Sequence, residues 1–379
     1  MKAVIAIDSF KGSLTSMEAG AAIYEGILAA KPDATVVIKP LADGGEGTTD
    51  ALIQGLGGER IELTVTGPMG KPVSAYYGLL RDEAGAPRLA VMEMATAAGI
   101  TLVSEAEKNP LLASTYGVGE MITDAIHRGC REFIMGIGGS ATNEGGIGML
   151  QALGFHFFDK EGNPVGEGAK ALGKVAKVCL ANALPELSQC HFRVACDVTN
   201  PLCGENGATY IFGPQKGVTV DIREDLDKAM ASYASQVAET VGANYMGAAG
   251  AGAAGGLGFA CLSFLQAELT PGIDLILDAV GLEEELADAD VVITGEGRLD
   301  HQTAMGKAPV GVAKLAKKHG VKVIAFAGSV TEEAKACNEA GIDAYFPILR
   351  GITTLAEAMN PENAKANMKA AVEQVFRLL

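Results

Sequence analysis

Five polar, glycine-containing clusters follow apolar runs of the sequence, and each holds residue types that bind phosphate, metal or carboxylate groups. The clusters are DSFKGS at 8–13, ADGGEGT at 42–48, GIGGSATNEGG at 136–146, CDVTNPL at 196–202 and TGEGRLD at 294–300. Any one of them alone is more typical of a loop that caps a helix. Because ligands of open α/β sheets bind beyond the carboxyl ends of the strands, the five together predict one ligand-binding cleft.

Two clusters have the composition of phosphate-binding loops. In the first, Ser9 and Ser13 precede a helix whose positive N-terminus attracts anions, and Lys11 adds a mobile cation. In the third, glycines permit turns with positive φ that point several backbone amides at one anion. The residues expected to cradle phosphate there are Gly138, Gly139, Ser140, Thr142 and Asn143. The simpler alternative is that Lys11 is solvated and that the polar residues of both loops only cap the helices that follow.

Carboxylates in the second and fourth clusters suit two different tasks. Asp43 and Glu46 lie three residues apart in one loop and fit a hard divalent cation that keeps water and phosphate oxygens as its other ligands. A cap of the following helix by Glu46 is an equal alternative. Asp197 ends the apolar run FRVAC, and we predict that it is a general base in partly dry surroundings, beside Asn200 as a substrate contact. Its alternative is an Asx turn before Pro201.

The last cluster places a cation between two anions. Glu296, Arg298 and Asp300 are the pattern expected when an arginine recognises a carboxylate and is held in place by acidic neighbours. A surface ion pair is the alternative. We predict that Arg298 binds a substrate carboxylate, with Glu296 and Asp300 as supports.

Apolar runs and helix signals alternate at both ends of the chain. The first predicted helix begins at a capping box formed by Thr15 and Glu18. Strands are predicted at 3–7, 35–38, 291–293, 321–327 and 344–347, with helices at 16–30, 47–56, 308–319 and 332–340. This pattern predicts an α/β fold whose flavodoxin- or Rossmann-like parallel sheet is discontinuous in sequence.

The middle of the chain has a different pattern. Two alternating runs within 60–80 flank the turn signal Gly-Pro-Met-Gly at 67–70, and later apolar runs are mixed with helix signals. We predict a larger inserted α/β domain with a mixed sheet at 59–287. Residues 1–58 and 288–379 then form the flavodoxin-like domain, and the active site is expected in the cleft between the two domains.

Composition excludes several classes of partner. The chain has 379 residues with 30 Lys+Arg and 46 Asp+Glu, a net charge of −16, which disfavours nucleic acid and anionic membranes. Its seven cysteines include no Cys-x-x-Cys pair, which favours a reducing cytoplasm over a disulfide framework. The uncharged stretch 240–267 is rich in glycine and alanine, so we expect a buried loop and helix. A homo-oligomer is left open.

Familiar nucleotide-binding signatures are missing or misplaced. The sequence contains no GxxxxGK[ST] loop and no protein-kinase signature. Gly250, Gly252 and Gly255 satisfy GxGxxG, but no predicted strand precedes them, so we predict that they do not bind a dinucleotide. Two hypotheses outside phosphoryl transfer remain: a dehydrogenase of a small hydroxy acid, and a non-catalytic metabolite sensor.

Taken in order, the clusters resemble the motifs of the bacterial type I glycerate kinases, from Met1 to beyond Gly328. The matching segments are DSFKGSLT, ADGGEGT, VTGPMG, GIGGSATNEGGIGMLQALG, ACDVTNPLCG, IFGPQKG, GAGAAGG, TGEGRLDHQT and GKAPVGVA. The resemblance implies a two-domain enzyme that phosphorylates D-glycerate with ATP and Mg²⁺ and yields 2-phosphoglycerate. Ile7 stands where the family usually has Pro, and Glu144 where it often has Asp.

These expectations combine into one mechanism of phosphoryl transfer. Asp197 is expected to accept the proton of the attacking hydroxyl group, and Lys11 to neutralise charge on the transferred group. Loop 138–146 would cradle phosphates and Arg298 would hold the glycerate carboxylate. Asp43, with Glu46 or Asp300, would position the metal.

Overall fold

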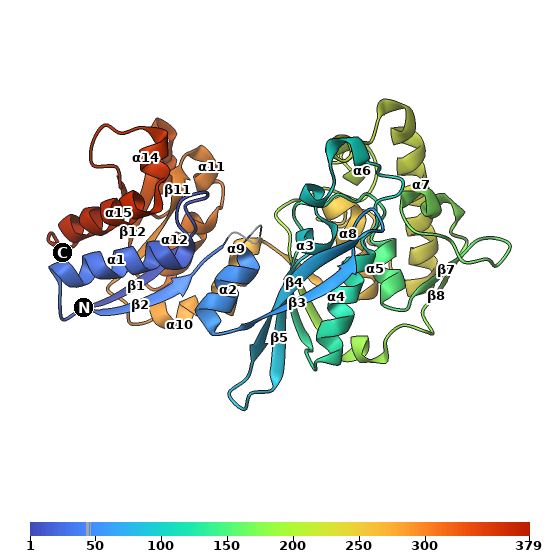
Figure 1. Cartoon of the computed structure of the whole chain (residues 1–379), viewed down its shortest axis with the longest axis horizontal. Helices are drawn as coiled ribbons and strands as arrows, with labels where there is room; N and C mark the ends of the chain where they lie inside the picture. The colour runs from blue at the N-terminus through green and yellow to red at the C-terminus, as the bar shows by residue number, and fades with distance from the viewer. Residues whose placement is uncertain (43–44, 46) are drawn as a thin grey trace. The chain divides into compact units, whose positions relative to one another are not determined.

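The computed structural model describes residues 1–42, 45 and 47–379, so the predicted metal ligands Asp43 and Glu46 lie outside the described residues. The chain forms two compact units, each visible in Figure 1. Unit 1 contains Met1–Asp43, Asp50–Gly57 and Ile273–Leu379, and unit 2 contains Gly44–Thr49 and Gly58–Gly272. Both units contain sheets and helices, which confirms the predicted α/β class.

Unit 1 is built on five parallel strands in the order β13-β12-β11-β1-β2. Their bounds are β1 Lys2–Ile7, β2 Thr35–Pro40, β11 Val291–Leu299, β12 Lys322–Val330 and β13 Ala344–Pro347. The chain runs from β1 to β2 on one side and from β11 through β12 to β13 on the other. The point where the strand order reverses therefore lies between β1 and β11, which is where sheets of this type bind ligands.

Helix α1 of unit 1 begins where the capping box was predicted. The Thr15 hydroxyl accepts a hydrogen bond from the Glu18 amide at 3.2 Å, and the Glu18 carboxylate accepts one from the Thr15 amide at 3.0 Å. The remaining helices that lie wholly or mostly in this unit are α2 Thr48–Leu56, α9 Gly272–Ala279, α10 Leu282–Leu286, α11 His301–Ala304, α12 Ala308–Lys318, α13 Ala336–Glu339, α14 Leu355–Met359 and α15 Pro361–Phe376, with α1 at Ser16–Ala30.

The C-terminal helix α15, which the sequence analysis does not predict, packs against α1 (Figure 1). A Cβ atom on Gly26 would lie 2.6 Å from the Lys369 carbonyl oxygen. Glycine at this position therefore allows the two helix backbones to approach closely. Met368, Val372 and Phe376 of α15 are fully buried, so the helix completes the core on this side of the sheet.

Unit 2 is built on a mixed sheet in the order β10-β9-β6-β5-β4-β3. Neighbours from β10 to β5 are parallel, while β5, β4 and β3 are antiparallel, with the predicted turn 67–70 joining β3 to β4. The bounds are β3 Glu59–Thr66, β4 Pro72–Arg81, β5 Pro87–Glu93, β6 Glu132–Gly136, β9 His191–Ala195 and β10 Glu268–Thr270; β7 His156–Phe158 and β8 Lys177–Cys179 form a separate pair.

The helices of unit 2 surround one large apolar core that includes Tyr77, Phe133, Tyr233 and Phe259. Their bounds are α3 Ala95–Ala98, α4 Tyr116–His127, α5 Ile147–Ala152, α6 Ala208–Ile211, α7 Val220–Val241 and α8 Ala253–Phe264. Within the described part of the chain, no helix is both long enough and apolar enough to span a membrane. The uncharged stretch forms loops and the buried helix α8.

The last passage between the units occurs after Gly272, whereas the boundary predicted from the sequence is at 287. Residues 273–287 belong with unit 1 because their apolar side chains pack there. A Cβ atom on Gly311 of α12 would lie 2.6 Å from a side-chain carbon of Ile273. Leu282 and Leu286 of α10 are fully buried, and α10 contacts both α12 and β1.

Candidate functional site

A cavity of about 450 Å³ lies at the carboxyl ends of the parallel strands of unit 1. Its lining includes six of the residues predicted to form the site: Ser9, Lys11, Ser13, Glu296, Arg298 and Asp300. The loop after β1 supplies the first three, the end of β11 supplies Glu296 and Arg298, and Asp300 directly follows β11, which matches the place where the strand order reverses. The structure thus brings together two clusters that are far apart in the sequence.

Close backbone packing fixes the loops around this cavity. The Asp8 amide donates to the Gly295 carbonyl oxygen at 3.0 Å. Gly295 has φ +153°, and a Cβ atom there would lie 1.9 Å from the Phe326 carbonyl oxygen. A side chain at position 295 would therefore separate β11 from β12, which explains the first glycine of TGEG in physical terms.

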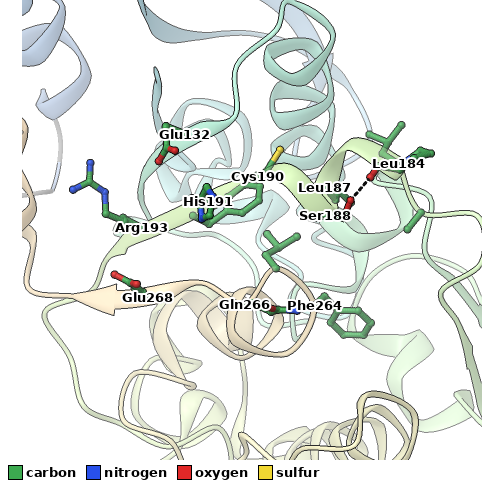
Figure 2. Close-up of a pocket in the computed structure, with 14 residues that line it drawn as sticks. Glu132, Leu184, Leu187, Ser188, Cys190, His191, Arg193, Phe264, Gln266 and Glu268 are labelled. Atoms are coloured by element: carbon green, nitrogen blue, oxygen red, sulfur yellow. Dashed lines mark hydrogen bonds between the residues drawn. The ribbon is translucent and has the colours of Figure 1, made fainter. Parts of the chain in front are cut away.

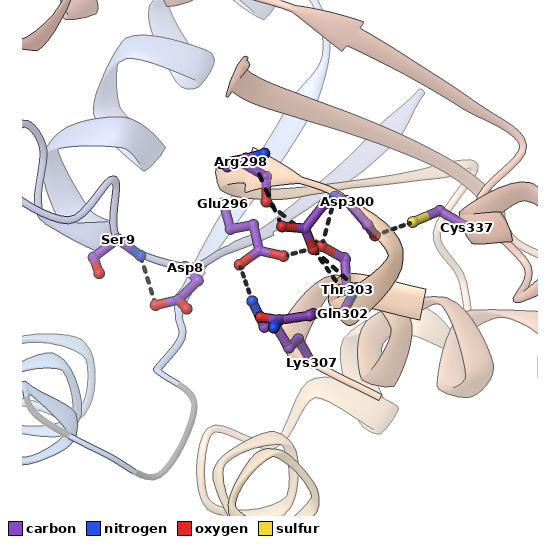
Figure 3. A network of polar contacts seen from close by, with 9 residues as sticks. All are labelled: Asp8, Ser9, Glu296, Arg298, Asp300, Gln302, Thr303, Lys307 and Cys337. Atoms are coloured by element: carbon purple, nitrogen blue, oxygen red, sulfur yellow. Dashed lines mark hydrogen bonds and ion pairs between the residues drawn. The ribbon is translucent and has the colours of Figure 1, made fainter. Parts of the chain in front are cut away.

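Glu296 is the centre of a polar network beside the cavity, as Figure 3 shows. Its carboxylate accepts a hydrogen bond from the Thr303 hydroxyl at 2.6 Å and lies 3.9 Å from the Lys307 ammonium group. Burial raises the pKa of Glu296, although the Thr303 hydrogen bond and Lys307 oppose that shift. Thr303 and Lys307 are functional-site neighbours that the sequence analysis does not identify.

Arg298 is the most exposed member of this group, with 65% of its side chain accessible. Its Nε atom lies 3.7 Å from a carboxylate oxygen of Asp300. The other Asp300 oxygen accepts from the amides of Gln302 and Thr303 and so caps α11. Asp300 thus holds Arg298 at the cavity while the guanidinium group stays accessible to an anion.

The β1 loop contributes one residue beyond those predicted. The Asp8 side chain lines the cavity, is 5% exposed, and accepts a hydrogen bond from the Ser9 amide at 2.6 Å. Its position directly after a buried parallel strand is the sequence signal that identifies it. The hydroxyl oxygen of Ser13 is buried, and among the described residues it has no hydrogen-bond partner.

Unit 2 also collects polar residues at one edge of its sheet. The register places Glu93 of β5 beside Gly136 of β6, Gly136 beside Ala195 of β9, and Ala195 beside Thr270 of β10. The loops that follow these strands therefore begin side by side. A cavity of about 440 Å³ lies at this edge. Its lining is Gly45, Ser74, Tyr76, Glu93, Ala95, Thr96, Ile100, Thr101, Leu102, Gly136, Gly138 and Gly139.

Loop 137–146 exposes the glycines at its start, whereas its polar side chains and the glycines at its end are buried. Gly138 and Gly139 are exposed and line the cavity. Thr142 and Asn143 are fully buried, and the Asn143 amide donates to the Thr209 hydroxyl at 3.0 Å. Backbone groups of the loop are thus available to a ligand, whereas the Asn143 side chain holds the loop from behind.

The misplaced GxGxxG motif supports this loop. The Gly145 amide donates to the Gly255 carbonyl oxygen at 2.9 Å. Gly255 has φ +67°, and a Cβ atom there would lie 2.1 Å from the Thr142 carbonyl oxygen. No strand immediately precedes the motif, which leads into α8, so its glycines permit contact between two backbones.

Lys216 and Glu93 are buried charged residues of unit 2 that the sequence analysis does not single out. Lys216 is 2% exposed, and its ammonium group donates to the Ser140 hydroxyl and the Thr142 carbonyl oxygen, both at 2.7 Å. Glu93 is 5% exposed and accepts from the amides of Gly47 and Thr49 at 3.3 and 2.8 Å. Lys216 lies in the segment IFGPQKG, which is the only sequence signal for it.

Asp197 lies beyond the end of β9 and is exposed, which contradicts the partly dry surroundings expected for it. Its carboxylate accepts a hydrogen bond from the Gly272 amide at 2.9 Å. The nearby Asn200 side chain donates to the Asn206 carbonyl oxygen at 2.8 Å. The apolar run FRVAC predicted a buried position, but β9 ends at Ala195, so Asp197 already lies outside the sheet.

Glu144, the residue at which the sequence departs from the family pattern, is fully buried and caps α5. It accepts hydrogen bonds from the Thr115 hydroxyl and the Gly148 amide, both at 2.7 Å. Burial raises its pKa to about 8, although both hydrogen bonds oppose that shift. The carboxyl group therefore takes up protons well above the usual pH range of a glutamate.

We expect Glu144→Gln to remove a part of the pH dependence of stability. Because the folded-state pKa of about 8 exceeds the ordinary 4.5, the stabilisation from this group is complete below pH 4.5 and is lost as pH rises through 8. The whole effect is on the order of 4 kcal/mol. Thermal unfolding from pH 5 to 7 measures a part of this effect: the stability of the variant relative to the wild type should increase as pH rises. Parallel curves for the two proteins would contradict the assignment.

A further cavity, of about 820 Å³, lies at the opposite edge of the unit 2 sheet (Figure 2). Glu132, His191 and Glu268, which begin β6, β9 and β10, are in its lining. None of the described residues predicted to form the site lines it. The predicted chemistry therefore belongs to the carboxyl edges of the two sheets.

Comparison with known proteins gives consistent matches over nearly the whole chain. The family model "Glycerate kinase family" matches residues 3–379. A glycerate kinase of Bacillus subtilis is 45% identical over 375 residues, covering 99% of this chain and 97% of the relative. A glycerate 2-kinase of Escherichia coli is 45% identical over 358 residues, covering 94% and 93%.

A solved structure gives the same result in three dimensions. It was assigned as a glycerate kinase 2 from Salmonella typhimurium LT2 and matches with a TM-score of 0.91 at 44% identity. The match covers 100% of this chain and 98% of the solved one. Sequence and fold thus point to the same group of proteins.

Proposed function

Because the chain belongs to the glycerate kinase family, we propose that it transfers the terminal phosphoryl group of ATP, with Mg²⁺, to the 2-hydroxyl group of D-glycerate. The protein is an enzyme, a phosphotransferase whose acceptor is an alcohol. The observation that carries the finer proposal is the gathering of Lys11, Glu296 and Arg298 around one cavity. A cation for phosphate and an accessible guanidinium group for a carboxylate are what ATP and glycerate require.

The proposal assigns different roles to residues of the two units. Arg298 binds the glycerate carboxylate, and Lys11 neutralises charge that develops on the transferred group. Exposed backbone at Gly138 and Gly139 binds nucleotide phosphate, since both glycines line a cavity at the edge of the sheet. Asp197 accepts the proton of the 2-hydroxyl group as that oxygen attacks the phosphorus atom in line with the leaving ADP.

The residues around the unit 1 cavity fit a magnesium ion. Mg²⁺ is usually held by one or two carboxylates together with phosphate oxygens, and Asp8 and Glu296 supply hard carboxylate oxygens at this cavity. Among the described residues no group of three or more His, Cys, Asp or Glu side chains could hold a metal. We propose these two residues as the ligands; the ligands predicted from the sequence, Asp43 and Glu46, lie outside the described residues. When bound, Mg²⁺ supplies positive charge to the phosphates.

The charge and cysteines of the chain support a cytoplasmic enzyme of small molecules. All seven cysteines are free thiols, which suits a reducing compartment. The net charge of −16 makes nucleic acid and anionic membranes poor partners. D-Glycerate and ATP are the proposed partners.

One assay series tests the function. The purified protein with D-glycerate, ATP and Mg²⁺ should release ADP in a coupled assay, and phosphorus NMR should identify 2-phosphoglycerate. Ligand binding without ADP release would favour a metabolite sensor. A change in NAD(P)H absorbance with glycerate would favour a dehydrogenase. Formation of 3-phosphoglycerate would retain the kinase and overturn the proposed position of transfer.

We expect Arg298→Ala to impair the use of glycerate more than the use of ATP. Losing a charge-assisted hydrogen bond costs about 1.5–3 kcal/mol, so kcat/KM for glycerate should fall roughly 10- to 100-fold. The KM for ATP should change by much less. Steady-state kinetics with each substrate varied in turn provide the measurement, and equal effects on both substrates would reassign the residue.

A further inference from the structure

Lys216 is a buried cation that has no carboxylate partner among the described residues. Its ammonium group donates to two neutral acceptors of loop 137–146, the Ser140 hydroxyl and the Thr142 carbonyl oxygen. In the described part of the chain, no acidic side chain forms an ion pair with it. Since a buried charge is costly unless it is paired, this arrangement has a large desolvation penalty with only partial compensation.

Tight backbone packing delivers Lys216 to this position. A Cβ atom on Gly213 would lie 2.2 Å from the Thr209 carbonyl oxygen, and Gly217 has φ +96°. These two glycines flank the short helical turn Pro214–Lys216. The side chain is therefore placed by its surroundings, and its contact with the loop is a fixed feature of the fold.

The charge lies behind a loop whose other side is open to ligands. Ser140 and Thr142 contact the ammonium group, whereas the preceding Gly138 and Gly139 are exposed and line the cavity. Positive charge is thus held on the inner side of a loop that presents backbone to the outer side. An anion on the outer side would offset that charge, and their attraction is strong because the lysine is removed from water.

Burial also makes this lysine responsive to its surroundings, because it lowers the pKa of Lys216 to about 7. Among the described residues, Glu93 lines the same cavity with its carboxylate accepting from the amides of Gly47 and Thr49, and two further titratable groups belong to or touch the loop. Glu144 directs its carboxylate to Thr115 and Gly148, and the Tyr233 hydroxyl donates to the Gly145 carbonyl oxygen at 3.3 Å, with a pKa raised well above its ordinary value by burial. Tyr233 stays neutral, so Glu144 is the group that experiments must separate from Lys216.

We propose that Lys216 is a positioning residue that fixes loop 137–146 and supplies the buried positive charge which a nucleotide phosphate bound at that loop neutralises. The inference rests on the proposed function, because it takes the phosphate to be that of ATP or ADP. It predicts that nucleotide binding favours the charged form of Lys216. Binding above neutral pH should therefore take up a proton from the solvent.

Titration calorimetry with ADP tests this in two buffers of different ionisation enthalpy. At pH 8.5 the phosphates of ADP are fully ionised, since their last pKa is about 6–7, and cannot account for uptake. The wild type should take up close to one proton per ADP. Its dissociation constant should rise by up to about tenfold from pH 7.5 to 8.5, which is the linkage of one proton.

Lys216→Met and Glu144→Gln form a matched pair of variants, since each replaces one buried ionisable group behind the loop. Lys216→Met should abolish the proton uptake and the pH dependence of ADP affinity, whereas Glu144→Gln should retain both. A purely structural lysine would leave the wild type without uptake. Uptake that persists in Lys216→Met, or that disappears in Glu144→Gln, overturns the proposal. If Lys216→Met does not fold, proton uptake by the wild type and by Glu144→Gln still tests the proposal.

These experiments distinguish a failure of this inference from a failure of the proposed function. A wild type that phosphorylates glycerate but takes up no proton on binding ADP contradicts this inference alone. A wild type that takes up a proton on binding ADP but does not phosphorylate glycerate contradicts the proposed function alone. Failure of the wild type to bind ADP contradicts both.

Discussion

Asp197→Asn is expected to lower kcat by about 10²- to 10⁴-fold, the contribution of a positioned general base. The asparagine keeps an oxygen that can accept the Gly272 amide, which Asp197 now accepts at 2.9 Å. The fold should therefore survive the change, while the ability to accept a proton is lost. Glycerate-dependent ADP release measures kcat, and thermal unfolding verifies that the variant is folded.

Asp159→Asn is a matched control for that experiment. Asp159 is a partly exposed aspartate that likewise accepts a backbone amide, that of Asn163 at 2.8 Å, but it lies in the loop after β7. Its variant should retain near-normal turnover. Near-normal turnover of folded Asp197→Asn would eliminate the residue as the base and direct attention to Asp8, the buried carboxylate of the unit 1 cavity.

Lys11→Met has the second large expected effect, a fall in kcat of about 10²- to 10³-fold. A charge aimed at the transferred group acts mainly in the transition state, and its removal has costs of this size. Lys11 lines the unit 1 cavity, and its charge opposes the rise that burial causes in the pKa of Glu296. Because Lys11 is exposed, the variant should unfold at nearly the same temperature as the wild type.

Lys322→Met is the control for the lysine variant. Lys322 is also exposed and belongs to unit 1, but it begins β12 and so lies at the amino edge of the sheet. Its loss should leave kcat unchanged. If the Lys11 variant has a higher KM for ATP but an unchanged kcat, Lys11 contributes equally to binding in the ground state and the transition state. The role assigned to it in the transition state would then be wrong.

Local signals account for the parts of the fold that were predicted from sequence. The capping box at Thr15 and the turn at 67–70 act over a few residues, so their patterns are readable without tertiary information. The parallel strands of unit 1 were recognisable because each is a short apolar run next to a helix signal. The clusters at 8–13 and 294–300 lie at the carboxyl ends of β1 and β11, which are neighbouring parallel strands. Their positions around one cavity therefore follow from the sheet topology.

The parts that were not predicted depend on contacts between distant segments. Helix α15 is half polar in sequence, and its burial depends on close approach to Gly26 of α1. Lys216 and Glu93 look like ordinary charged residues until the fold buries them against loop and helix backbones. The apolar residues before Asp197 predicted that its side chain is partly buried. Its exposure depends instead on which segments pack against the loop after β9, and the local sequence does not give that.

The pairing of β1 with β11 has a consequence for the order in which the protein is made. Ala3 pairs with Val291, and α1 packs on α15, so β1 and α1 find these partners only after β11 and α15 have been synthesised. All of β3 to β10 leaves the ribosome in the meantime, and unit 2 can fold during that interval. The nascent strand β1 can pair early with β2 on one side, whereas its other edge lacks its native partner until β11 has emerged.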